Sequence, residues 1–176
     1  IGEGLQPDKV RVIPNFVDVE EIRPLPSQNH FSERSDLAGK FVVMHAGSVA
    51  FRHGLEIVLD VAKKLVDLPD VIFVIVGGGS RFGEFQELAA QAGLANVRVL
   101  PWQPRSDLPE MRASADVHLI LLRRGMTSHS VPCKVYEIMA SGRPFVAAID
   151  PDSEIDRIAR DGRCGIAVPP EDPRAI

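Results

Sequence analysis

The stretch VIFVIVGGGSRFG, residues 71–83, joins a continuous apolar run to a glycine-rich turn, and a helical pattern follows it. An apolar run without alternation is typical of a strand that is buried on both faces of a sheet. Beyond the turn, apolar side chains recur at the spacing of one helix face, at Phe85, Leu88, Ala89 and Ala92. A buried strand, a turn and an amphipathic helix in this order predict one unit of a parallel sheet covered by helices.

The same pattern repeats along the chain. Further apolar runs occupy residues 41–46, 97–100, 117–122, 144–148 and 165–168. Helical spacing appears between them, at residues 55–65 and from Ser106 onward. We therefore expect a doubly wound α/β fold with a parallel sheet of about six strands, formed by one domain over residues 1–176. Residues 20–40, with Pro and Ser at several positions, are expected to form a polar loop before the first core strand.

Composition excludes several classes of protein. With 176 residues and 45% hydrophobic content, the chain can bury one core. The formal net charge of −4 and the lack of a basic stripe argue against nucleic-acid binding. Cys133 and Cys164 are the only cysteines, and their separation favours a reducing cytoplasm over a disulfide framework. No apolar run reaches the roughly 20 residues that span a bilayer. The histidines lack metal-ligand spacing, so we expect no metal site, and His45 and His118 fall within strand runs as core imidazoles do.

Ligands of a doubly wound sheet bind beyond the carboxyl ends of the strands, so the loops after the strands are candidate sites. The turn after the second run lacks the G-x-G-x-x-G fingerprint, because Phe82 stands at the third glycine position, which argues against hydride transfer. In the loop after the first run, Gly47 lets backbone approach a ligand and Arg52 can reach a phosphate. Trp102, after the third run, either stacks on a base or packs under its loop.

The segment SVPCKVYEIMASGRP, residues 130–144, is predicted to be a binding helix. Ser130 is a suitable N-cap and Gly142 a suitable end. Lys134 and Glu137 fall on one face, near a helix N-terminus whose free amides favour an anion such as phosphate. A ligand that carries phosphates and a vicinal diol matches this pair of charges. The alternative from these residues alone is a surface helix with a solvated Lys–Glu pair.

This segment also resembles the signature of the retaining family 4 glycosyltransferases of the GT-B fold. In that signature a glutamate, seven residues, a second glutamate, small residues, Gly and Pro follow one another. Glu137 matches the second glutamate, Gly142 and Pro144 match the end, and His129 stands at the place of the first. The sequence from Val131 to Pro144 is similar to the corresponding sequence in a bacterial subgroup of surface-polysaccharide enzymes. IPNFVD, residues 13–18, is similar to the IPNGVD element that opens the C-terminal domain of these transferases.

The resemblance implies roles for individual residues. Glu137 would hold the ribose hydroxyls, and His129 would contact the donor sugar. Further residues would line the nucleotide, namely Gly47, Ser48, His53, Gly77, Gly78, Trp102, Gln103, Ser130 and Val131.

The resemblance also implies how the diphosphate is held. The family uses two cations in the loop after the first strand, and Ser48 and His53 stand at their positions in this chain. Arg52 and Lys134 would then supply the positive charge. Because these cations stabilise the leaving diphosphate, no divalent metal or other cofactor is required.

The function that the resemblance implies is that of a donor domain. It would bind a nucleotide sugar, with UDP-sugars as the expected class, for retaining transfer to a glycan or a lipid-linked sugar. That acceptor would bind in a missing N-terminal domain, which would also carry any peripheral membrane association at the inner face of the membrane. Because the chain begins without Met and ends where Asp172 and Pro173 suggest a helix start, we expect a fragment that binds donor without transferring sugar.

Two alternatives stay open at this point. A GT-B sugar-nucleotide 2-epimerase shares the architecture and a UDP ligand. A noncatalytic nucleotide-binding domain would fit the departures from the family pattern at His129 and Ser48.

Overall fold

A six-stranded parallel sheet in the order β3-β2-β1-β4-β5-β6 forms the centre of the molecule. The computed structural model describes residues 9, 11, 13, 15–127 and 132–176. The strands are β1 (Phe41–Ser48), β2 (Val71–Gly78), β3 (Val97–Pro101), β4 (Val117–Leu121), β5 (Phe145–Ala148) and β6 (Gly165–Val168). The helices are α1 (His30–Arg34), α2 (Glu56–Lys64), α3 (Phe82–Ala92), α4 (Leu108–Ala113), α5 (Lys134–Ala140) and α6 (Glu154–Gly162), with short 3-10 turns η2 (Phe51–His53) and η3 (Arg105–Asp107).

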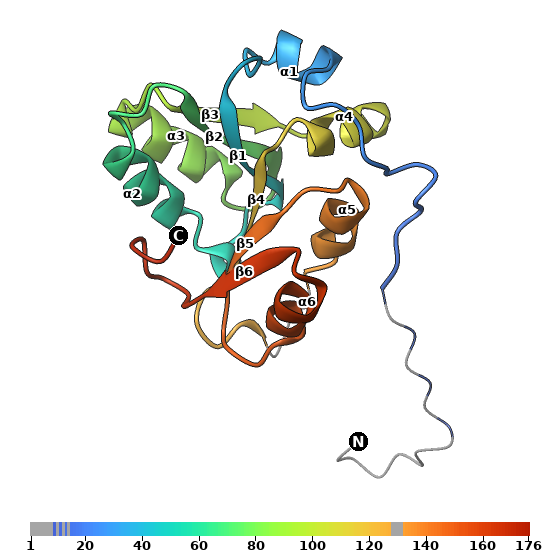
Figure 1. The fold of residues 1–176 in the computed structure, drawn as a ribbon. Coiled ribbons are helices and arrows are strands. Elements are labelled where there is room, and N and C mark those ends of the chain that lie inside the picture. Colours follow the sequence, from blue (N-terminus) through green and yellow to red (C-terminus); the bar gives the residue numbers. More distant parts are fainter. Residues whose placement is uncertain (1–8, 10, 12, 14, 128–131) are drawn as a thin grey trace.

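Helices cover both faces of the sheet, which confirms the doubly wound α/β prediction (Figure 1). Helices α2 and α3 lie on one face, and α4, α5 and α6 lie on the other. Strand β2 shows why its sequence is apolar throughout. Phe73 and Ile75 belong to the core cluster under α2 and α3, whereas Val74 and Val76 belong to a cluster on the opposite face. Alternate side chains of a strand point to opposite faces, so a strand covered on both sides is mostly apolar at successive positions.

The segment expected to be a polar loop, residues 20–40, contains the short helix α1. Asn29 caps this helix by accepting from the Ser32 amide, while the Ser32 hydroxyl accepts from the Asn29 amide. Asn29 also donates to the Glu110 carbonyl oxygen at 3.0 Å, and Phe31 is fully buried against the core. The prediction was wrong here because a five-residue helix shows too little periodicity to be recognised. Its stability comes from the cap and from packing.

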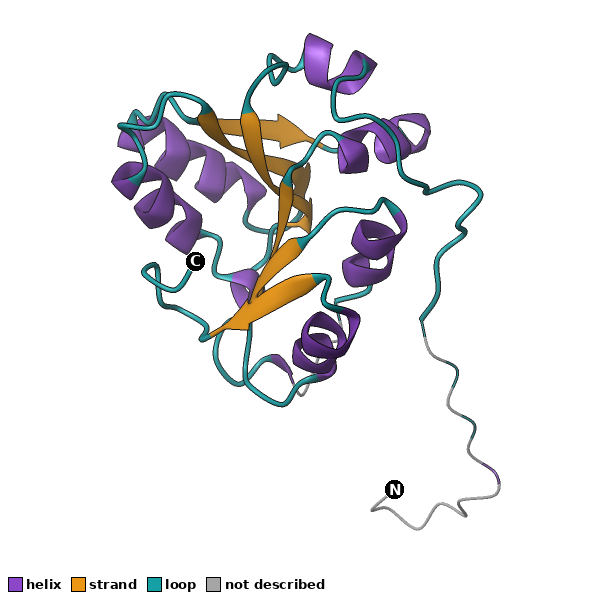
Figure 2. Cartoon of the chain, in the orientation of Figure 1, coloured by secondary structure: helices purple, strands orange, loops and turns teal. Residues whose placement is uncertain are grey.

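The predicted binding helix begins later than its sequence pattern suggested. We expected Ser130 to be the N-cap, but α5 begins at Lys134 with Cys133 at the N-cap position. Pro132 and Cys133 form a turn that leads into the helix, in which the Val135 amide donates to the Pro132 carbonyl oxygen at 3.2 Å. The predicted end is confirmed, since Gly142 follows the helix with φ +69°. The segment before α1 runs past α4 and α5, where Arg143 donates to the Leu25 carbonyl oxygen (Figure 2).

The strand order places the switch point of the sheet between β1 and β4. Connections from β1 lead to one side of the sheet and those from β4 to the other, so the loops diverge beyond their carboxyl ends. Gly47 stands near the end of β1, and α5 follows β4 along the chain. The predicted site residues on these two elements therefore meet at one edge of the sheet.

Candidate functional site

The ammonium group of Lys134 lies over the backbone of Gly47. A Cβ atom on Gly47 would be 2.9 Å from Lys134 Nζ and 3.3 Å from Cε. Nζ also lies 3.3 Å from Nε2 of His45, a buried residue of β1. Because glycine has no side chain, the end of β1 leaves room for a cation above its backbone. The structure thus brings together two residues that are 87 positions apart and that the sequence had marked separately.

Lys134 has an electrostatic environment that favours an anion. Burial, and then the positive charge of Arg112, lower the pKa of Lys134 to about 7, although Glu137 acts in the opposite direction and Arg52 adds to the lowering. A negatively charged ligand that binds beside such a lysine stabilises its protonated form. Arg52 is exposed, and its charge reaches Lys134 from η2. The two predicted cations therefore act on the same place.

Glu137 faces a different partner from Lys134. Its carboxylate pairs with Arg112 of α4, and no ion pair joins it to Lys134 in the part of the chain that the structure describes. Nε and Nη2 of Arg112 donate to the same oxygen, Oε2, at 3.0 and 2.5 Å. The alternative of a solvated Lys–Glu pair on a surface helix is therefore wrong, because each charge has its own place in the fold.

The histidines near Lys134 are neutral at neutral pH. Burial, followed by the charge of Lys134, holds the pKa of His45 well below its ordinary value. Burial also lowers the pKa of His53 to about 4, with Lys134 and Arg52 contributing. The two rings lie side by side with centroids 5.9 Å apart. His53 stands where the resembling family has a cation, so this site depends on Lys134 and Arg52 for positive charge.

Glycines and an exposed aromatic ring continue the site across the ends of β2 and β3. A Cβ on Gly77 would be 1.8 Å from the Gly47 carbonyl oxygen, so these two strand ends approach closely because both residues are glycine. A Cβ on Gly78 would be 2.5 Å from Nε1 of Trp102. The Trp102 side chain is 60% exposed, so the ring lies against Gly78 and is open to solvent rather than packed under its loop. Gln103 donates to the Pro101 carbonyl oxygen at 2.9 Å.

Three of the predicted site residues, Ser130, Val131 and His129, lie outside the described residues. Ser48 ends β1 opposite Gly78 of β2 and is half-buried. No group of three or more His, Cys, Asp or Glu side chains is placed to hold a metal ion within the described ranges.

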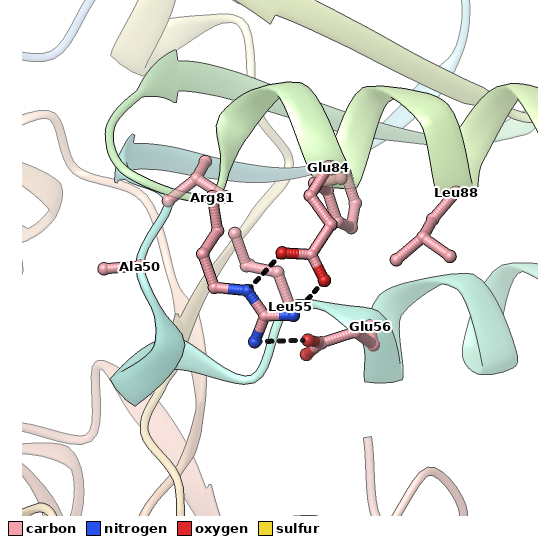
Figure 3. A pocket seen from close by; sticks show the side chains of 8 residues that line it. Ala50, Leu55, Glu56, Arg81, Glu84 and Leu88 are labelled. Carbon is pink, nitrogen blue, oxygen red and sulfur yellow. Dashed lines mark hydrogen bonds and ion pairs between the residues drawn. The ribbon is translucent and has the colours of Figure 1, made fainter.

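A neighbouring hollow beyond the glycine turn is closed by an ion cluster. Arg81 bridges Glu84 of α3 and Glu56 of α2, beside Leu55 and Leu88 (Figure 3). The hollow encloses about 10 Å³, which is the room of about one water molecule. It is too small for a nucleotide, and the candidate site is the strand edge where the predicted residues Gly47 and Lys134 meet.

Sequence reasoning missed Arg112. Arg112 lies in the third expected helix next to Met111, and a charged side chain in a helix is normally expected to be exposed to solvent. In the structure its side chain is buried, and only the position of α5 relative to α4 reveals its partner.

Buried His118 predicts an acid-sensitive fold. Burial, and then the charge of Arg112, lower the pKa of His118 to about 3, while its Nε2 donates to the Arg112 carbonyl oxygen at 3.0 Å. The folded pKa is below the unfolded value, so the stabilisation is present above about pH 6.5 and is lost as pH falls toward 3. We expect this residue to lower the unfolding free energy by about 2 kcal/mol between pH 7 and 5.

Urea unfolding at pH 7, 6 and 5 measures this loss. His118→Asn should make the pH dependence less steep by the share of this one residue, because His45 and His53 also have lowered pKa values, whereas His30→Asn, at an exposed position, should leave it unchanged. An equally steep dependence in His118→Asn and the wild type would contradict the assignment.

The fold and the strand-edge site define an open doubly wound α/β domain, whose ligands bind beyond the strand ends at the switch between β1 and β4. The family model of the glycosyl transferases group 1 matches residues 40–176. The chain belongs to this family.

A curated relative agrees with that assignment, and solved structures share the fold. The chain is 27% identical over 161 residues to WcaI of Escherichia coli K12, named as a colanic acid biosynthesis glycosyl transferase, and this match covers 90% of the chain and 39% of WcaI. Its fold matches HepE of Anabaena in complex with UDP and glucose, with a TM-score of 0.74, 22% identity and coverage of 98% and 46% of the two chains. It also matches the C-terminal domain of the group 1 glycosyl transferase LpcC of Francisella tularensis, with a TM-score of 0.67, 18% identity and coverage of 90% and 82%. The chain therefore spans less than half the length of WcaI and of HepE.

No helix within the described residues is both long enough and apolar enough to cross a membrane.

Proposed function

We propose that this chain is the C-terminal, donor-binding domain of a family 4 retaining glycosyltransferase and that it binds a UDP-sugar. The match to a domain described as the C-terminal domain of a group 1 enzyme supports its place in the whole protein. The UDP bound to HepE supports the nucleotide.

One observation carries the proposal. Lys134 and Glu137 stand one turn apart on α5, with the ammonium over Gly47 and the carboxylate turned toward Arg112. The cation matches the diphosphate, and a carboxylate oxygen accepts hydrogen bonds from the ribose diol.

The proposed chemistry is stabilisation of the leaving group. When the bond between sugar and diphosphate breaks, negative charge grows on the diphosphate oxygen. Lys134 and Arg52 stand where that charge develops, and preorganised cations favour the transition state over the ground state. The domain would therefore promote departure of UDP without a divalent metal ion.

For the whole protein, we propose retaining transfer to a polysaccharide or lipid-linked acceptor, in the cytoplasm at the inner face of the membrane. The name of WcaI, which refers to the biosynthesis of a polysaccharide, supports this class of acceptor. The family match favours glycosyl transfer over 2-epimerisation.

Thermal denaturation with nucleotides tests the proposal. UDP at about 100 times its Kd should stabilise the chain by about 2.7 kcal/mol, which corresponds to about 5–10 °C in melting temperature. Uridine and inorganic phosphate should give smaller shifts, because each engages only one part of the site. Equal melting temperatures with and without UDP and UDP-sugars at millimolar concentration would overturn the proposal.

A further inference from the structure

Arg112 is the least exposed cation among the ion pairs of the described residues. Its side chain is 6% exposed, whereas the next least exposed, Arg123, has 27%. A buried charge is costly unless it is paired and hydrogen-bonded. Its place inside the fold therefore calls for an explanation beyond a surface ion pair.

The backbone and side chain of Arg112 are both held by the sheet. Nη1 donates to the Ala46 carbonyl oxygen of β1 at 3.4 Å. The carbonyl oxygen of Arg112 accepts from Nε2 of His118 in β4 at 3.0 Å. The Ala46 contact restricts the guanidinium and the His118 contact restricts the backbone of Arg112, so the direction of the guanidinium is set before any ligand binds.

The guanidinium engages only one oxygen of Glu137. Nε and Nη2 of Arg112 both donate to Oε2. Within the described ranges, no donor lies within hydrogen-bond distance of Oε1. The Glu137 side chain is 36% exposed, so the carboxylate is anchored on one side and open on the other. A ribose diol needs an acceptor of this kind, because its hydroxyls donate to a carboxylate.

The same contact keeps Glu137 away from Lys134. The two residues are neighbours on α5, where opposite charges three positions apart normally attract each other. Here Lys134 lies against Gly47 and His45, and Glu137 lies against Arg112. Without the guanidinium, the carboxylate would be free to pair with Lys134 and to compete with a diphosphate for it.

We propose that Arg112 is a positioning residue that orients Glu137 toward the ribose hydroxyls of the nucleotide. The inference rests on the proposed function of the site. Arg112 itself does not touch the ligand, and its effect is transmitted through the Glu137 carboxylate. Selectivity for nucleotides with a vicinal diol is the property that depends on it.

Calorimetry with two ligands tests this role. UDP and 2′,3′-dideoxyuridine 5′-diphosphate carry the same base and phosphates and differ in the hydroxyls that Glu137 would accept. The wild-type chain should bind UDP at least about tenfold more tightly, as expected for hydrogen bonds to a charged acceptor. Arg112→Gln should reduce this ratio to below about threefold, and Arg112→Lys, which lacks the planar fork, should give an intermediate ratio.

A double variant separates positioning from a general loss of structure. If Arg112 acts through Glu137, Arg112→Gln combined with Glu137→Gln should have the same ligand ratio as Glu137→Gln alone. Arg160→Gln, which removes an ion pair with Asp156 on α6, serves as the matched control and should keep the wild-type ratio. A ratio in Arg112→Gln equal to that of the wild type, while Glu137→Gln loses it, would overturn the positioning role.

The wild-type chain gives a second test that does not need a stable variant. The side-chain Nε–H signal of Arg112 in NMR spectra should shift when UDP binds and stay in place with the dideoxy analogue. A shift of equal size with both ligands would contradict the inference. If UDP does not bind to the wild type, or binds no more tightly than the dideoxy analogue, the proposed function or its ribose contact fails instead, which keeps the two failures distinct.

Discussion

Glu137→Gln should weaken UDP binding at least tenfold and weaken pyrophosphate binding much less. The carboxylate of Glu137 is held by Arg112 with one oxygen open, and a neutral amide accepts hydrogen bonds from hydroxyls less strongly. A hydrogen bond to a charged group contributes about 1.5–3 kcal/mol, which corresponds to about 10- to 150-fold in affinity. Pyrophosphate lacks the ribose and therefore does not report this contact. Isothermal titration calorimetry with both ligands measures the difference.

Glu87→Gln is the matched control for this variant. Glu87 is exposed on α3, and the same change of charge there should leave both affinities within twofold of the wild type. If Glu137→Gln weakens UDP and pyrophosphate equally, Glu137 acts on the phosphates and the ribose assignment is refuted.

Lys134→Met should weaken binding of both UDP and pyrophosphate, and it should remove the pH dependence of binding above neutrality. Burial and the charge of Arg112 lower the pKa of Lys134 to about 7, so the free chain loses this cation as pH rises above 7. A bound diphosphate favours the protonated form, and binding therefore takes up a proton. We expect wild-type affinity for pyrophosphate to fall more than tenfold from pH 7 to 9, and the variant to lack this fall.

The other groups around Lys134 do not produce this profile. The pKa values of His45 and His53 are lowered below the tested range, and arginine side chains do not titrate in it. Lys63→Met, at an exposed position of α2, should keep the wild-type pH dependence. Parallel profiles in Lys134→Met and the wild type would remove Lys134 from the anion site.

Stability measurements distinguish loss of binding from loss of folding in the Lys134 variant. The folded pKa of Lys134 is lower than the unfolded one, so folding below about pH 10 carries a cost for the protonated side chain. Lys134→Met removes this cost, and the ligand-free variant should melt at a higher temperature than the wild type. A site that binds an anion is expected to show such an exchange of stability for function.

The sequence by itself determined the strands, the fold class and the loops in which to search. Continuous apolar runs such as residues 71–76 occur where both faces of a strand are buried, and this is a local pattern that needs no knowledge of neighbours. The glycine at the end of α5 was recognisable for a similar reason, because Gly142 adopts a positive φ that other residues avoid.

Only the tertiary structure decided which charges meet. Lys134 and Glu137 are three residues apart, but the sequence could not show that one lies over Gly47 and the other pairs with Arg112. Helix α1 was missed for a related reason, since its stability comes from Asn29 reaching α4 across the fold. Partners such as Arg112 and Glu137 are brought together by the packing of α4 and α5 on the sheet. Contacts of this kind join distant segments, so a pattern within one segment carries no trace of them.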